Sequence, residues 1–205
     1  MPISKEDALK QANTIFKNVI KDSNLLSEVL KNVRDKEDSI RYPNALALEK
    51  LSEKQPEIIY PQWDFMVDLL KSNNAFHKSI AIANISNLTY IDEQNKFDKI
   101  FNEFFNLIDN KSVMITRKLV IYSGRIAKAK PSLRSKITKI LLKIDETQHN
   151  QDRKDLIKGD IIETFSEYFK DIKEKKDILD FVRAQLNSTS PSAVKKAKSF
   201  LKRWK

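Results

Sequence analysis

Residues 62–88 read QWDFMVDLLKSNNAFHKSIAIANISNL, and this stretch decides the fold of the chain. An apolar helical pattern ends at Leu69 and Leu70, residues 71–74 form a short polar break, and a second apolar pattern follows through Ile80. This order predicts two helices joined by a tight turn, which is a helical hairpin. Because a single hairpin cannot bury its apolar stripe alone, the pattern also predicts that it stacks on similar neighbours.

The hairpin recurs along the chain. The predicted first helices of five hairpins end at steps of 40, 38, 36 and 42 residues, at Leu30, Leu70, Ile108, Ile144 and Leu186. A helical hairpin that recurs about every 40 residues is typical of stacked helical arrays. We therefore expect an all-α fold, a right-handed α-solenoid of about five helical hairpins.

Residues 4–21 precede the first hairpin and are expected to form an N-terminal capping helix that begins at Ser4, with Asp7 three residues on. The hairpins then fill residues 24–205, and no linker rich in proline, glycine or serine interrupts them. The sequence thus predicts one continuous domain over residues 1–205. Pro43 is expected in the first turn of the second helix of the first hairpin, where its missing N–H costs nothing.

The third hairpin has the clearest apolar stripe. Its spacings of three and four residues predict a buried helix face rather than an aromatic platform for nucleobases, and it includes Phe97, Phe101, Phe104 and Phe105. Two glycines, Gly124 and Gly159, fall inside predicted second helices, where each costs about 1 kcal/mol relative to alanine. We expect close approach of a neighbouring helix to compensate for this cost.

Several hairpin motifs share one pattern. The pair Leu-Leu at 69–70 before the turn, His-Lys at 77–78 and the small apolar run at 80–83 resemble the second-helix motif of HEAT-repeat (armadillo-type) proteins. Asp109 and Arg117 resemble the turn aspartate and the second-helix arginine of that family. The resemblance covers residues 24–205 and implies a fold, but no activity.

One enzyme branch of HEAT-like proteins offers a second resemblance. Trp63, Asp64 and Asp68 resemble the Trp/Asp segment of the bacterial alkylpurine DNA glycosylases, which hold damaged DNA in a concave groove. This resemblance implies base excision with an aspartate as the catalytic residue. The alternative for Asp64 and Asp68, four residues apart on one helix face, is a solvated surface.

Composition excludes several function classes. The chain has no cysteine, which excludes disulfides and thiol nucleophiles, and it has no phosphate-binding glycine-rich loop. His77 and His149 have no partner at ligand spacing, so we expect surface residues, no metal and no cofactor. A polar N-terminus and the lack of a long apolar run predict a cytoplasmic protein that does not enter a membrane.

The basic residues are the functional lead. Residues 1–110 contain 14 Lys and Arg against 17 Asp and Glu, whereas residues 111–205 contain 24 against 11. Second helices line the concave face of HEAT arrays, so the resemblance implies that the basic residues of the second half share one trough. These are Arg117, Lys118, Arg125, Lys128, Arg153, Lys154, Lys158, Lys195, Lys196, Lys198, Lys202 and Arg203.

Such a trough suits an anionic partner, either an acidic protein segment or nucleic acid. We expect an interaction scaffold that binds a protein partner along this face. The alternative is a nucleic-acid-binding protein, including a HEAT-like glycosylase acting on alkylated bases. A lysine-rich surface that only keeps the chain soluble remains a further alternative.

Overall fold

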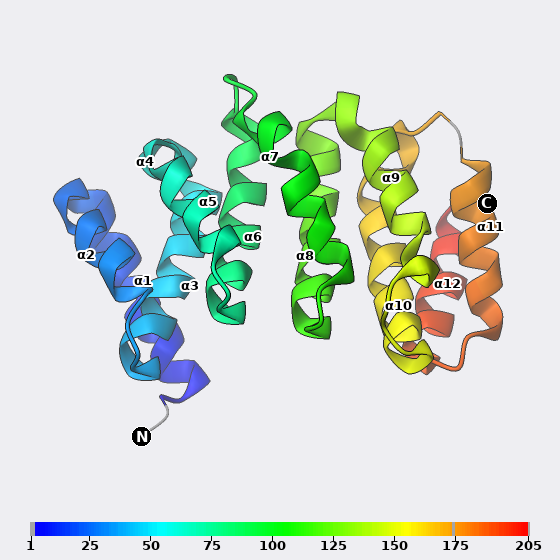
Figure 1. Ribbon diagram of the computed structural model, residues 1–205, viewed down its shortest axis with the longest axis horizontal. Helices are drawn as coiled ribbons and strands as arrows, with labels where there is room; N and C mark the ends of the chain where they lie inside the picture. Colours follow the sequence, from blue (N-terminus) through cyan, green and yellow to red (C-terminus); the bar gives the residue numbers. More distant parts are fainter. Residues whose placement is uncertain (1–2, 174, 205) are drawn as a thin grey trace. The chain divides into compact units, whose positions relative to one another are not determined.

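A computed structural model describes residues 3–173 and 175–204, and the regular elements in these ranges are all helices (Figure 1). The chain divides into two compact units, Met1–Ile91 and Asp92–Lys205. The prediction of one continuous domain stays a prediction, because each unit forms its own set of contacts.

The described residues of the first unit form six α-helices: α1 (Lys5–Lys21), α2 (Leu26–Asn32), α3 (Asp38–Lys54), α4 (Pro56–Ile59), α5 (Trp63–Lys71) and α6 (Ala75–Leu88). Helix α3 packs against both α1 and α6, and α5 packs against α6. The predicted N-cap is confirmed, because the Asp7 N–H donates to the Ser4 hydroxyl at 3.1 Å. The hairpin of residues 62–88 is also confirmed, with Asn74 as the N-cap of its second helix.

The position predicted for Pro43 is wrong. Helix α3 begins at Asp38, so Pro43 lies inside the helix and not in its first turn. Proline there removes one backbone donor from the helix. The side-chain amide of Asn44 donates to the Ile40 carbonyl at 2.8 Å, and thereby adds a polar contact in the same turn.

In the second unit, the part of the chain that the structure describes also forms six α-helices: α7 (Lys96–Phe105), α8 (Val113–Ala129), α9 (Arg134–Leu142), α10 (Gln151–Tyr168), α11 (Lys176–Ala184) and α12 (Pro191–Arg203). Helix α10 packs against α8 and α12, and α11 packs against α9. We call α8, α10 and α12 the second-helix layer. In Figure 1, α9 and α11 lie in front of α10 and α12.

Three of the predicted first-helix ends fall in 3-10 turns that follow the helices. Ile108 lies in Asn106–Asp109, Ile144 in Ile144–Glu146 and Leu186 in Gln185–Asn187. A tighter last turn is common where a helix ends. The apolar pattern therefore continues beyond the α-helix into the turn.

The phenylalanine stripe of α7 is core, as predicted. Phe97 and Phe104 are fully buried, and Phe101 and Phe105 are 3% exposed. Phe97 and Phe104 meet edge to face with ring centroids 5.3 Å apart, a favoured geometry for aromatic pairs.

His149 corrects the expectation that both histidines are surface residues. Its side chain is only 6% exposed, and its Nε2 lies 3.0 Å from the Thr116 hydroxyl of α8. The residue precedes the N-cap of α10 and thus links the start of this helix to α8. His77 is half-buried and lies 3.0 Å from the Ser72 hydroxyl in the turn before α6.

Candidate partner-binding surface

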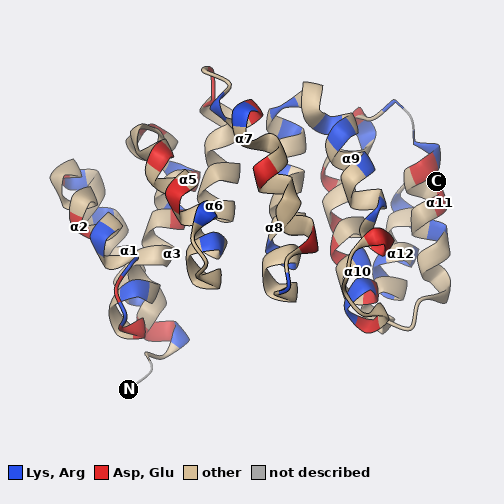
Figure 2. Ribbon diagram, in the orientation of Figure 1, with Lys and Arg blue, Asp and Glu red and all other residues tan. Residues whose placement is uncertain are grey.

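The second-helix layer carries all twelve basic residues that the sequence singled out. Its three helices contain twelve Lys and Arg but five Asp and Glu (Figure 2). The charge of the whole chain has the same bias, because residues 1–91 hold 12 basic and 12 acidic residues and residues 92–205 hold 26 and 16. The net charge of +10 therefore resides in the second unit.

Asp160 of α10 joins the three helices of this layer. Its carboxylate accepts from the Arg117 Nε of α8 at 2.6 Å and from the Lys196 Nζ of α12 at 3.2 Å. The hydrogen bond to Asp160 raises the pKa of Arg117. Lys196 also pairs with Glu163, at 2.9 Å. Asp160 is only 2% exposed, so a buried carboxylate neutralises Arg117 and Lys196 of the predicted basic trough.

Glu167 is a second acidic residue of α10 that approaches α8. Its side chain is exposed, but its carboxylate lies against α8, where a Cβ added to Gly124 would meet it at 2.7 Å. Partial burial of the carboxylate against α8 raises the pKa of Glu167, although the charges of Lys128 and Arg125 act in the opposite direction. Gly124 therefore makes room for a side chain and not for a helix backbone.

Gly159 fits the expected close approach of helices. A Cβ added there would lie 3.4 Å from the Ala193 Cα of α12 and 3.5 Å from the Lys196 Cδ. The absence of a side chain at this position brings α12 close to α10.

Two of the predicted residues are bound to Asp145. Lys158 is 7% exposed and pairs with the Asp145 carboxylate at 2.7 Å, and Lys154 donates to the Asp145 carbonyl at 2.8 Å. We therefore leave these two residues out of the candidate surface.

The remaining predicted residues lie on the layer. Arg153, Lys128, Lys195, Lys198, Lys202 and Arg203 are exposed, and Arg117, Lys118, Arg125 and Lys196 are half-buried. Lys118 and Arg125 both lie over the Tyr122 ring, at 5.3 and 5.0 Å from its centroid. Tyr122 thus holds two cations along α8.

Sequence reasoning missed two apolar residues of this surface. Met114 and Ile121 of α8 are 56% and 45% exposed. They lie seven residues apart on the helix face that also carries Lys118 and Arg125. The signal was present in the sequence as spacing, because these positions are out of phase with the buried Ile115, Leu119 and Ile126.

The pairing implied for Asp109 and Arg117 is absent from the described contacts, and each residue has a partner in the next hairpin. The Asp109 carboxylate accepts from the Gln148 N–H at 2.7 Å, and Arg117 binds Asp160. Both contacts cross about 40 residues of sequence, so they tie one hairpin to the following one.

The resemblance to the DNA glycosylases is not supported. Trp63 is 3% exposed and packs on Tyr60 with ring centroids 5.9 Å apart, so its ring is not available to stack on a base. Asp64 and Asp68 are exposed, in line with a solvated helix face.

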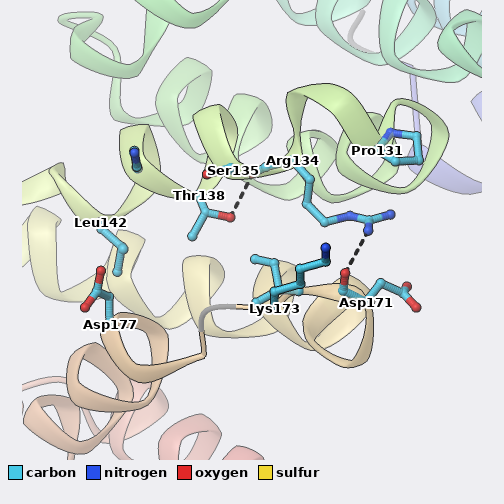
Figure 3. A pocket seen from close by; sticks show the side chains of 10 residues that line it. Pro131, Arg134, Ser135, Thr138, Leu142, Asp171, Lys173 and Asp177 are labelled. Atoms are coloured by element: carbon cyan, nitrogen blue, oxygen red, sulfur yellow. Dashed lines mark hydrogen bonds between the residues drawn. The ribbon is translucent and has the colours of Figure 1, made fainter.

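A pocket of about 360 Å³ lies between α9, α11 and the segment after α10 (Figure 3). The Arg134 guanidinium at its edge donates to the Asp171 carbonyl at 2.9 Å, and the Thr138 hydroxyl donates to the Arg134 carbonyl at 2.9 Å. These polar groups already have hydrogen-bond partners within the protein, and the lining contains both the cation Lys173 and the anion Asp177. The pocket therefore does not favour a ligand of either charge.

Among residues 3–173 and 175–204, no three His, Asp or Glu side chains converge in a way that would hold a metal ion. Nor does any helix of the described chain combine the length and the apolar character needed to cross a membrane.

Comparisons with known proteins identify the fold. No family model and no curated protein matches the sequence. The crystal structure of an engineered protein matches with a TM-score of 0.54 and 15% identity, over 97% of this chain and 88% of that one. A designed armadillo repeat protein in complex with the peptide (KR)4 matches with a TM-score of 0.55 and 13% identity, over 98% and 92%. The chain thus has an all-α, armadillo-like repeat fold, as predicted.

Proposed function

We propose that this armadillo-like repeat protein is an interaction scaffold that binds an acidic segment of a partner protein on its second-helix layer. The observation that carries the proposal is the charge of this layer, with twelve basic and five acidic side chains on α8, α10 and α12. Rows of exposed lysine and arginine favour an anionic partner and increase its rate of association.

The distribution of charge favours a protein over nucleic acid. Glu163 and Glu167 form an exposed acidic row on α10, between the basic helices α8 and α12. A nucleic-acid backbone carries phosphates at short and regular intervals, so it would meet this row unfavourably. A peptide can place carboxylates over α8 and α12 and a neutral residue over α10.

The similar designed protein supports a peptide partner, but of the opposite charge. Its structure contains the basic peptide (KR)4. If the same kind of surface is used here, the positive net charge of the second unit calls for an acidic peptide in its place.

The test measures binding of three fluorescent probes to the intact chain: a peptide of alternating Glu and Ala, the peptide (KR)4, and a 20-base-pair DNA duplex. The test variant replaces three exposed lysines of the layer, Lys128→Glu/Lys195→Glu/Lys202→Glu. The control variant replaces three exposed lysines of α1 in the same way: Lys5→Glu/Lys17→Glu/Lys21→Glu.

We expect the acidic peptide to bind to the unaltered chain, and its affinity for the layer variant to be lower by about tenfold or more. Reversing each exposed charge changes the binding free energy by a fraction of a kcal/mol to about 1 kcal/mol. The α1 variant should have a much smaller effect. Equal loss in both variants would overturn the proposal. Preference for the duplex, with affinity falling steeply as salt rises, would instead support the nucleic-acid alternative.

A further inference from the structure

The exposed face of α8 combines positive charge with two apolar side chains. Met114 and Ile121 are 56% and 45% exposed, and α8 contains four basic residues and no acidic one. Among the described residues of the second-helix layer, these two are the exposed large apolar side chains. Single exposed apolar residues are common on protein surfaces, but here two of them share one face of one helix.

The spacing of the two side chains has a geometric meaning. Seven residues are nearly two helical turns, so Met114 and Ile121 lie on the same face and about 10.5 Å apart along the axis. In a helix of a binding partner, residues i and i+7 have the same spacing. In an extended strand, side chains on one face repeat at about 6.7 or 13.4 Å, which does not match.

Two cations alternate with this apolar pair along α8. Lys118 and Arg125 are each four residues after one of its members, so they lie one turn further along the same face. The Tyr122 ring holds both cations, at 5.3 and 5.0 Å. An occupant of this face therefore meets apolar and cationic groups in alternation: Met114, Lys118, Ile121 and Arg125.

We infer that the α8 face binds an acidic amphipathic helix, with two apolar residues at i and i+7 and carboxylates next to each of them. The inference rests on the proposed function and specifies the partner segment. The apolar pair provides contacts that desolvate Met114 and Ile121. The carboxylates of the partner meet Lys118 and Arg125, so the α8 face favours an acidic helix over a neutral one.

The experiment uses fluorescence anisotropy with the intact chain and four 18-residue peptides of equal net negative charge. The first carries leucine at i and i+7, and the second carries alanine at both positions. The third carries leucine at i and i+5, which point to different faces of a helix. The fourth matches the first but has two central prolines, which prevent a continuous helix.

Protein variants then locate the contact. Ile121→Ser and Met114→Ser each remove one apolar contact from α8. The matched control is Ile20→Ser on α1, because Ile20 is 44% exposed and Ile121 is 45% exposed. Circular dichroism checks that each variant remains folded, and if one of the α8 variants unfolds, the other decides.

We expect the first peptide to bind at least about tenfold more tightly than the other three, a difference of about 1.4 kcal/mol. Either α8 variant should remove most of this advantage, and Ile20→Ser should leave it intact. If all four acidic peptides bind equally, the inference is overturned while the proposed function stands. If none of them binds, the proposed function itself has failed.

Discussion

Asp160 offers a test in which stability and binding should change in opposite directions. The substitution Asp160→Asn keeps the size of the side chain but removes its charge and replaces one acceptor oxygen by a donor. In the structure, that carboxylate accepts from Arg117 at 2.6 Å and from Lys196 at 3.2 Å. Its side chain is 3% exposed, whereas those of Arg117 and Lys196 are 38% and 22% exposed.

These exposures set the magnitude. Removing one partner of a fully buried ion pair costs about 3–5 kcal/mol, because the other charge stays buried. Here both cations reach solvent and can be hydrated, so we expect a smaller cost, about 1.5–3 kcal/mol, comparable to the loss of one charge-assisted hydrogen bond. For a chain of this size, that loss lowers the melting temperature by about 3–12 °C.

The assay is urea unfolding followed by circular dichroism, with Asp180→Asn as the control. Asp180 also accepts from two cations, Lys176 at 2.7 Å and Arg183 at 3.1 Å, but its side chain is 48% exposed. Exposed ion pairs contribute little to stability, so the control should lose much less of it. Equal losses for the two variants would show that Asp160 has no special role in joining α8 to α12.

Binding should change in the other direction. Asp160→Asn removes a negative charge from the centre of the second-helix layer, which frees Arg117 from this ion pair and leaves Lys196 paired with Glu163, so an acidic peptide should bind more tightly. Asp180→Asn changes the net charge of the chain equally, but it lies on α11, outside this layer. A drop in affinity for Asp160→Asn in a folded variant would refute our account, because the carboxylate would then position the cations for the partner.

Three further predictions concern stability. Phe104→Ala should cost about 3–5 kcal/mol, seen as a lower melting temperature, because the fully buried ring leaves a cavity in the core. Burial alone would raise the pKa of Asp155, but hydrogen bonds led by that from Thr189 outweigh it and lower the pKa below its ordinary 3.8. This stabilisation is present above pH 3.8 and is lost as pH falls through the lowered pKa, so the cost of Asp155→Asn, about 1–3 kcal/mol in urea unfolding at pH 7, should shrink in acid. Gly159→Ala should raise the free energy of unfolding, measured in urea, by up to about 1 kcal/mol, because the added methyl meets Ala193 at an ordinary 3.4 Å, whereas Gly159→Leu should lower it.

The helices and their buried faces could be predicted because local rules decide them. The Ser4 cap, the turn before α6 and the phenylalanine stripe of α7 all depend on residues within one or two helical turns. Pro43 was misplaced because a helix start depends on a competition among several weak signals. Here the helix begins five residues earlier and tolerates the lost donor.

Which basic residues are paired with carboxylates could not be predicted from the number of basic residues. Arg117 and its partner Asp160 are 43 residues apart in sequence, and they meet only because α8 packs against α10. Likewise, Lys158 reads as one more surface lysine until the structure shows Asp145 beside it at 2.7 Å. A charge count therefore predicts the sign of a partner, and the packing of neighbouring hairpins decides which cations remain for it.

Gly159 connects these two levels. By local rules it weakens α10 by about 1 kcal/mol relative to alanine. In the structure it lies beside Asp160 and lets α12 approach, so that the Lys196 Cδ would be 3.5 Å from a Cβ at this position and the Lys196 ammonium reaches the Asp160 carboxylate at 3.2 Å. A large side chain at position 159 would move Lys196 away from α10 and from the Asp160 carboxylate. One residue that disfavours its own helix thus determines how two neighbouring helices share their charges, and with them the surface that we propose for the partner.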